Sequence, residues 1–216
     1  MKKVNLLLSA FALSFALISC GGNAEAPKGD EAQSEMTEEE TAKDQGERMN
    51  ATLTADTTQS FVHWKGTLVG VYSHEGNVKL EKGFLEMENG EVVGGEFIVD
   101  MSSIQPTDEN YNAEEGKTPE KLVGHLSSGE FFAIEDHPTA TFVVKSANRE
   151  TKEITGDLTI RGNTHEEKVT NVVFNDGSAT GTLVFDRQKY DVSWKAMKDM
   201  VLEDDIELEI NLVAQK

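Results

Sequence analysis

The 216-residue sequence is poor in cysteine and in positive charge. Cys20 is the only cysteine, and 20 lysines and arginines stand against 39 aspartates and glutamates, a formal net charge of −19 at pH 7. A single cysteine excludes an intramolecular disulfide. The excess of negative charge argues against nucleic acid and anionic lipid surfaces as partners. The function therefore belongs to a class that needs neither a disulfide framework nor a basic surface.

Recognisable catalytic and metal-binding motifs are also missing. No serine lies in a nucleophile elbow, and no glycine-rich loop opens a helix. The five histidines show none of the i, i+2 or i, i+4 pairings that place two ligands of one metal on a single element: His63, His74, His125, His137 and His165. No metal and no catalytic residue are therefore expected. A hydrolase or redox enzyme stays open only if distant segments assemble a cluster.

The sequence has one long apolar run, at its start. Lys2 and Lys3 precede an apolar stretch over residues 4–18, shorter than the roughly 20 residues that a membrane-spanning helix needs. This pattern predicts a secretory signal peptide over residues 1–19. The run ends in Leu-Ile-Ser-Cys, which looks like a bacterial lipobox, so we expect Cys20 to become the lipidated first residue.

Residues 20–50 have the composition of a tether. Nine acidic and three basic residues lie between residues 21 and 50, with almost no large apolar side chains. Such a segment cannot bury enough surface to offset its ordering entropy, which predicts a disordered acidic tether behind Cys20. The residue directly after Cys20 is Gly21. It is not the aspartate that commonly retains lipoproteins in inner membranes. We therefore expect an outer-membrane lipoprotein of the cell envelope, with its domain in the periplasm or at the cell surface.

Period-two alternation dominates the chain from residue 60 onward. Ile206, Leu208, Ile210 and Leu212 alternate with polar residues, which predicts a strand with one apolar face. The same pattern predicts inward Val93, Phe97, Val99 and Met101 in one strand, and inward Ile154, Leu158 and Ile160 in another. Further predicted strands cover residues 60–69, 76–88, 138–149, 167–175 and 178–187, with 189–195 as a weaker candidate.

Turn signals and glycines limit the number of folds that the strands can form. Glu88-Asn89-Gly90 and Asn175-Asp176-Gly177 predict short hairpins and hence an antiparallel meander. Glycines in the inward phase, at Gly66, Gly95 and Gly156, would bend the sheet or leave space inside it. About eight antiparallel strands are compatible with either a barrel or a sandwich. An eight-stranded barrel is wide enough inside for one small ligand.

The domain sequence also contains one helical candidate and one charged residue beside an apolar strand. Residues 118–127 are the one helical candidate, with Thr118 as a plausible N-cap and Pro119 in the first turn. Arg161 is out of phase with the apolar residues of its strand, so we expect it to point outward and pair with an acidic neighbour. Such a pair at the surface is worth about 0–1 kcal/mol.

Two segments carry a resemblance to a known family. They are residues 122–142, LVGHLSSGEFFAIEDHPTATF, and residues 154–162, ITGDLTIRG. The order and spacing of His125-Leu126, Glu130-Phe131-Phe132, 138–142 and 155–162 resemble the YceI-like family of lipocalin-like, polyisoprenoid-binding proteins. The resemblance covers roughly residues 53–216. It implies an all-β domain over residues 51–216, built as an eight-stranded antiparallel lipocalin-like barrel with one short helix near 118–127.

The resemblance also implies a ligand class. A polyisoprenoid or similar apolar or amphipathic molecule would bind in the barrel without chemical change, so a bound lipid is the only cofactor expected; a dimer is possible. A barrel with a filled core, acting as an envelope scaffold, is the alternative. His125 could meet a ligand head group or cap a loop. The expected wall residues are Trp64, Phe97, Val99, His125, Phe131, Phe132, Phe142, Leu158, Ile160, Phe185, Leu208 and Ile210.

Overall fold

The computed structural model describes residues 50–70, 72–193 and 201–216. The predicted signal peptide, the lipidation site at Cys20 and all of the predicted tether except Asn50 lie outside these residues. Among the described residues, no helix is long and apolar enough to cross a membrane.

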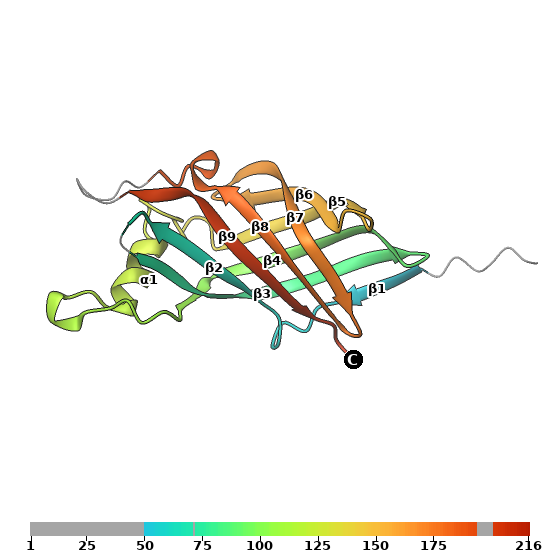
Figure 1. The fold of residues 1–216 in the computed structure, drawn as a ribbon, viewed down its shortest axis with the longest axis horizontal. Coiled ribbons are helices and arrows are strands. Elements are labelled where there is room, and N and C mark those ends of the chain that lie inside the picture. Colours follow the sequence, from blue (N-terminus) through green and yellow to red (C-terminus); the bar gives the residue numbers. More distant parts are fainter. Residues whose placement is uncertain (1–49, 71, 194–200) are drawn as a thin grey trace, which may run out of the picture. The chain divides into compact units, whose positions relative to one another are not determined.

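The described residues form nine strands and one α-helix (Figure 1). The strands are β1 (Asn50–Thr54), β2 (Phe61–Leu68), β3 (Tyr72–Glu88), β4 (Glu91–Pro106), β5 (Thr139–Asn148), β6 (Glu153–Ile160), β7 (Asn163–Asn175), β8 (Ser178–Asp186) and β9 (Leu202–Val213). The helix is α1 (Pro119–Ser127), and two 3-10 turns are η1 (Ala113–Glu115) and η2 (Arg187–Tyr190).

Eight of these strands close into an antiparallel barrel. The order β3-β2-β9-β8-β7-β6-β5-β4 is completed by pairing of β4 with β3, while β1 adds to the second half of β3. Closure leaves no open edge in the ring, because each strand has a partner on both sides. The predicted fold class is confirmed.

The inward phase of the two clearest strands is also confirmed. In β6, Ile154, Leu158 and Ile160 are buried, and in β9 Ile206 is buried while Glu207 and Glu209 are exposed. Leu208, Ile210 and Leu212 pack against the buried core. The alternation predicts the inward residues of these strands correctly, because side chains in a strand have a period of two and every second residue lies on the same face.

The predicted phase of β4 is wrong at its start. Val92 is buried at 7% exposure, whereas Val93, which we expected to point inward, is 46% exposed. Glu86 pairs with Gly94 but Met87 pairs with Val92, so Val93 is an extra residue in the ladder. Gly95 follows with φ +154°, a backbone angle that L side chains rarely adopt. This β-bulge reverses the phase between Val93 and Phe97.

The weaker strand candidate over 189–195 is also wrong where the structure describes it. Residues 187–190 form η2, which ends at Asp191 in the left-handed conformation. Tyr190 and Val192 are fully buried. Their burial comes from packing of a turn into the core rather than from pairing in the sheet.

One end of the barrel, here called the helix end, carries α1, the segment 107–138, the turn at 161–162 and η2. The helix starts as predicted, because the Thr118 hydroxyl accepts a hydrogen bond of 3.3 Å from Lys121 N and Pro119 occupies the first turn. The opposite end, the hairpin end, holds the turns after β3, β5 and β7. In Figure 1 the helix end lies at the left.

Arg161 does not point into solvent as predicted. Its side chain is 15% exposed, and Nη1 donates to Phe131 O at 2.6 Å and to Asp191 O at 2.7 Å. The acidic neighbour exists, since Asp191 Oδ2 lies 3.7 Å from Nη2, but the two carbonyls are the closer partners. Arg161 follows the last residue of β6 with φ +51°, which takes it out of the strand's alternation. It joins the segment after α1 to η2.

Aromatic rings lie against the wall of the barrel where a neighbouring strand has a glycine. A Cβ on Gly76 would meet Trp64 Cζ2 at 2.8 Å, and one on Gly156 would meet Phe142 Cζ at 2.6 Å. Phe97 covers Gly83 in the same way. These glycines let large side chains lie along the sheet instead of filling the centre of the barrel.

We expect Gly156→Ala to lower the free energy of unfolding by about 1–3 kcal/mol, because the new methyl would lie 2.5 Å from Val143 O. Gly66→Ala is the matched control, since its methyl would find only Ile206 Cδ1 at 3.5 Å and Leu202 Cδ1 at 4.0 Å. That change should be neutral or stabilising by up to about 1 kcal/mol. Urea unfolding of both variants measures the difference. Equal stabilities would contradict the close packing of the Phe142 ring and the Val143 carbonyl against Gly156.

Candidate ligand-binding site

The barrel encloses an apolar cavity of about 460 Å³. Every strand of the closed ring contributes side chains to its wall, and α1 with the segment after it contributes Leu122, His125, Leu126, Phe131 and Phe132. The interior is therefore hollow, in contrast to the filled core that was the alternative. Space of this kind suits a ligand held mainly by apolar contacts.

All twelve expected wall residues line this cavity. Their contact with a ligand remains a prediction. The strands supply Trp64 from β2, Phe97 and Val99 from β4, Phe142 from β5, Leu158 and Ile160 from β6, Phe185 from β8, and Leu208 and Ile210 from β9. His125, Phe131 and Phe132 come from α1 and the segment behind it.

An aromatic cluster lies over the helix end of the cavity. The rings of His125 and Phe131 meet edge to face at 5.5 Å, and those of Phe131 and Phe132 at 4.9 Å. Phe131 is buried, and its carbonyl accepts the hydrogen bond from Arg161. Edge-to-face packing of this kind fixes ring positions beyond what burial alone gives. His125 thus takes part in packing at the edge of the cavity.

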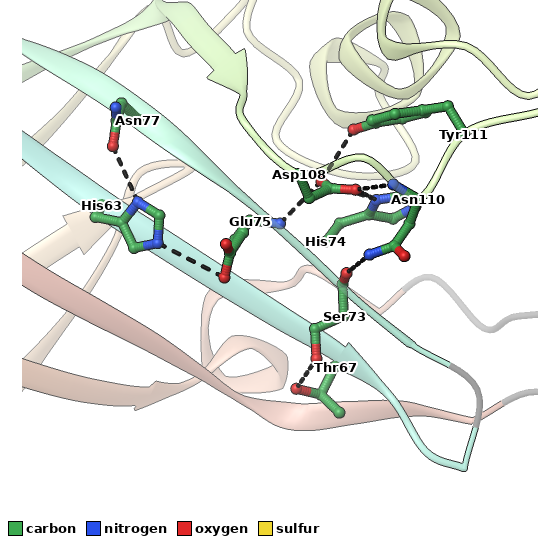
Figure 2. Close-up of polar contacts among 9 residues, drawn as sticks. All are labelled: His63, Thr67, Ser73, His74, Glu75, Asn77, Asp108, Asn110 and Tyr111. Atoms are coloured by element: carbon green, nitrogen blue, oxygen red, sulfur yellow. Dashed lines mark hydrogen bonds and ion pairs between the residues drawn. The ribbon is translucent and has the colours of Figure 1, made fainter.

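A polar cluster at the helix end was missed by the sequence analysis (Figure 2). Asp108 accepts hydrogen bonds from the His74 ring at 3.1 Å, the Tyr111 hydroxyl at 3.0 Å, Asn110 N at 2.9 Å and Glu75 N at 3.2 Å. The His74 and Tyr111 rings stack with centroids 5.3 Å apart. His74, Asn110 and Tyr111 line the cavity, whereas Asp108 lies behind them with a side chain 5% exposed.

The hydrogen bonds decide the charge state of this cluster. Burial by itself would raise the pKa of Asp108, but the bonds from Asn110 N, Glu75 N, His74 and Tyr111 outweigh it and lower the pKa below the usual 3.8. Burial and then the Asp108 carboxylate raise the pKa of the Tyr111 hydroxyl. A lowered carboxylate pKa stabilises the fold above the unfolded pKa and loses that contribution only as the pH falls through the folded value. The cluster therefore stays intact at neutral pH.

A signal for His74 was present in the sequence. Tyr72, His74 and Gly76 extend the inward phase of Val78 and Leu80 toward the start of β3, but the predicted strand began at residue 76. Asp108 and Tyr111 lie in the segment between β4 and α1, where no periodic pattern indicates their direction. The loop before β5 also holds two acidic residues, Glu130 and Asp136, and both are exposed.

A second hollow of about 490 Å³ lies at the hairpin end. It shares seven residues with the wall of the first cavity, among them Leu85 and Phe97, but its rim carries charged side chains such as Arg149 and Glu153. The apolar interior is thus longer than the first cavity alone. Among the described residues, no group of three His, Cys, Asp or Glu side chains is placed to hold a metal ion.

Comparison with known proteins places this barrel in a family. The model of the YceI-like domain matches residues 53–214. A UPF0312 protein of Staphylococcus epidermidis strain RP62A is 33% identical over 107 residues, which are 45% of this chain and 61% of the relative. A UPF0312 protein of Staphylococcus aureus strain USA300 is 40% identical over 81 residues, which are 32% of this chain and 46% of that protein. The chain thus spans less than two thirds of the length of these relatives.

The comparison with solved structures gave matches as well. BcnA of Burkholderia cenocepacia is 21% identical and has a TM-score of 0.56, with 74% of this chain and 99% of BcnA covered. A polyisoprenoid-binding domain from Saccharophagus degradans, implicated in plant cell wall breakdown, is 9% identical and has a TM-score of 0.48. The match covers 77% of this chain and 99% of that domain. At such identities the likeness of BcnA concerns the fold alone. The match of the family model over three quarters of the sequence shows that this chain belongs to the YceI-like domain family.

Proposed function

We propose that this protein binds one long apolar or amphipathic molecule, such as a polyisoprenoid, inside the barrel and releases it chemically unchanged. The observation that carries the proposal is the cavity of about 460 Å³ with its almost wholly apolar wall. Removing apolar groups from water contributes about 0.8 kcal/mol per methylene, so a chain of isoprene units can be held with few polar contacts. Family membership supports the same ligand class.

Extraction of lipids from the purified protein, followed by mass spectrometry, tests this proposal. We expect a copurifying chain-like lipid, or, after its removal, saturable binding of an added polyprenol. Protein that carries no lipid in several independent preparations and binds no added isoprenoid would refute it. A non-catalytic role further requires that the bound molecule is recovered with unchanged mass after incubation.

We also propose that the protein is anchored to the outer membrane of the cell envelope through Cys20. The support is the sequence around Cys20, with a short apolar run before it and an acidic, solvated segment after it. A single acyl chain gives only marginal membrane binding, so stable anchoring needs more than one chain on the lipidated residue.

Replacing Cys20 by Ser should abolish lipid attachment, because the sequence has no other thiol. Metabolic labelling with a fatty-acid probe, followed by fractionation, measures this directly. The wild-type chain should carry label in the membrane fraction, and the Cys20→Ser chain should carry none. Label that persists on the variant would show that Cys20 is not the attachment site.

A further inference from the structure

Solvent reaches inward-facing side chains at the hairpin end of the barrel. Val172 and Phe174 both line the first cavity from β7. Val172 is 9% exposed, whereas Phe174, two residues nearer the turn, is 47% exposed. In the same way Leu85 of β3 is buried, whereas its ladder partner Leu53 on β1 is exposed and lines the second hollow. The barrel is therefore open at this end.

The hollow at the hairpin end continues the first cavity. Seven residues line both spaces, and three of them are here called the junction: Phe97 on β4, Phe174 on β7 and Ala179 on β8. In the ladders, Ala179 pairs with Phe174 on one side and with Leu212 on the other. All of these side chains are apolar. A flexible apolar chain in the cavity can thus reach the hollow along an apolar wall.

The elements at this end leave the hollow uncovered. The helix and both 3-10 turns lie at the helix end, and the hairpin end is bounded by β1 and the short turns at 89–90, 149–152 and 176–177. A Cβ on Gly90 or Gly177, which line the hollow, would meet no atom within 4 Å. Within the described part of the chain, no segment therefore packs against these two glycines.

Irregular pairing occurs in all three hairpins at this end. The ladders of β3 with β4, β5 with β6 and β7 with β8 shift register at Glu86/Met87, Val144/Ser146 and Thr170/Val173. A bulge bends its strand and strengthens its twist, and bulges are common at the rims of barrels. The three hairpins therefore depart from the regular course of the barrel wall near this rim.

We propose that the cavity has a second mouth at the hairpin end, and that the terminal part of a long polyprenyl or acyl chain passes the junction and lies in it. Each methylene moved from water into the apolar hollow adds to the affinity, so chains that reach it bind more tightly than shorter ones. This inference rests on the proposed function, because the same ligand must occupy the cavity. It adds that the protein selects chains by length and admits chains longer than the closed part of the barrel.

Protection of an introduced thiol tests the second mouth on the full chain. In a Cys20→Ser background, Phe174→Cys carries a single thiol. Val184→Cys is the matched control, because Val184 is 48% exposed on β8 and lines neither space. The probes are geraniol, which is short, and undecaprenol, which is long, each delivered in cyclodextrin to protein freed of lipid.

A water-soluble maleimide should label both variants in the absence of a probe. Undecaprenol at about ten times its Kd should slow labelling of Phe174→Cys by about tenfold through mass action. Geraniol should leave that rate unchanged, because it fills only the closed part of the cavity. Neither probe should alter the labelling of Val184→Cys.

Ala179→Phe tests the junction independently, because a phenyl ring opposite Phe174 obstructs the passage. It should lower the preference for undecaprenol over geraniol by at least about tenfold, whereas Val184→Phe should keep the wild-type preference. Undecaprenol that binds without protecting Phe174→Cys, and with a preference unaffected by Ala179→Phe, would overturn the second mouth and leave the apolar-ligand function standing. Failure of both probes to bind would overturn the second mouth and the apolar-ligand function together.

Discussion

Ile210→Glu is expected to cost several kcal/mol of stability and to abolish binding of an apolar ligand. Ile210 lies on β9 between Val62 of β2 and Gly181 of β8, and its side chain lines the cavity. A carboxylate there has only apolar neighbours on its face of the sheet, so it must remain unpaired or take up a proton with a strongly raised pKa. Thermal unfolding should show a drop of roughly 2–4 °C for each kcal/mol lost.

Glu209→Gln is the control for the same strand. Glu209 is exposed on the outer face and pairs across the ladder with His63 and Thr182. Removing its charge changes no contact in the core, so the melting temperature should shift by little. Equal melting of Ile210→Glu and Glu209→Gln would mean that the face of β9 assigned to the cavity is the wrong one.

Arg187→Met is expected to lower the free energy of unfolding by about 3–5 kcal/mol. Arg187 is 3% exposed, and its guanidinium donates to Glu203 O at 3.0 Å, Val192 O at 2.5 Å and Leu202 O at 3.4 Å. It also bonds Asp204 Oδ1 at 3.0 Å. Methionine keeps much of the apolar stem but has no donor, so these acceptors lose their partners.

The loss should appear as a lower midpoint in urea unfolding with an unchanged slope. Arg149→Met is the comparison, because the Arg149 side chain is 81% exposed and its nearest carboxylate contact, Glu91, is at 3.6 Å. A surface pair of this kind contributes about 0–1 kcal/mol. A small effect of Arg187→Met, no larger than that of Arg149→Met, would show that solvent reaches the carbonyls at the start of β9.

Much of the wall of the barrel could be predicted from the sequence. Residues such as Leu158 and Leu208 lie in strands of unbroken alternation, and a local pattern of period two is enough to assign their face. The helix could be predicted for a similar reason, since the Thr118 cap and Pro119 act within one turn. The family resemblance, carried by residues 122–142 and 154–162, favoured a barrel over a sandwich.

The direction of other side chains depends on segments far away in the chain. Val93 points outward because β3 lacks a residue to match it, so the bulge belongs to the pair of strands and not to β4 alone. Arg161 turns inward because the carbonyls of Phe131 and Asp191, each 30 residues away, converge on it. Burial of such donors and acceptors requires that they meet, and only the closed barrel brings them together.

The polar cluster at the helix end has the same origin. Local alternation indicates that His74 faces inward, but its partners Asp108 and Tyr111 reach it only because the segment after β4 returns over the helix end. The sequence by itself determined which residues form strands and which faces are apolar, because these properties depend on near neighbours. The tertiary structure decided that the interior stays hollow and that its polar groups gather at one end, because both depend on the register between distant strands.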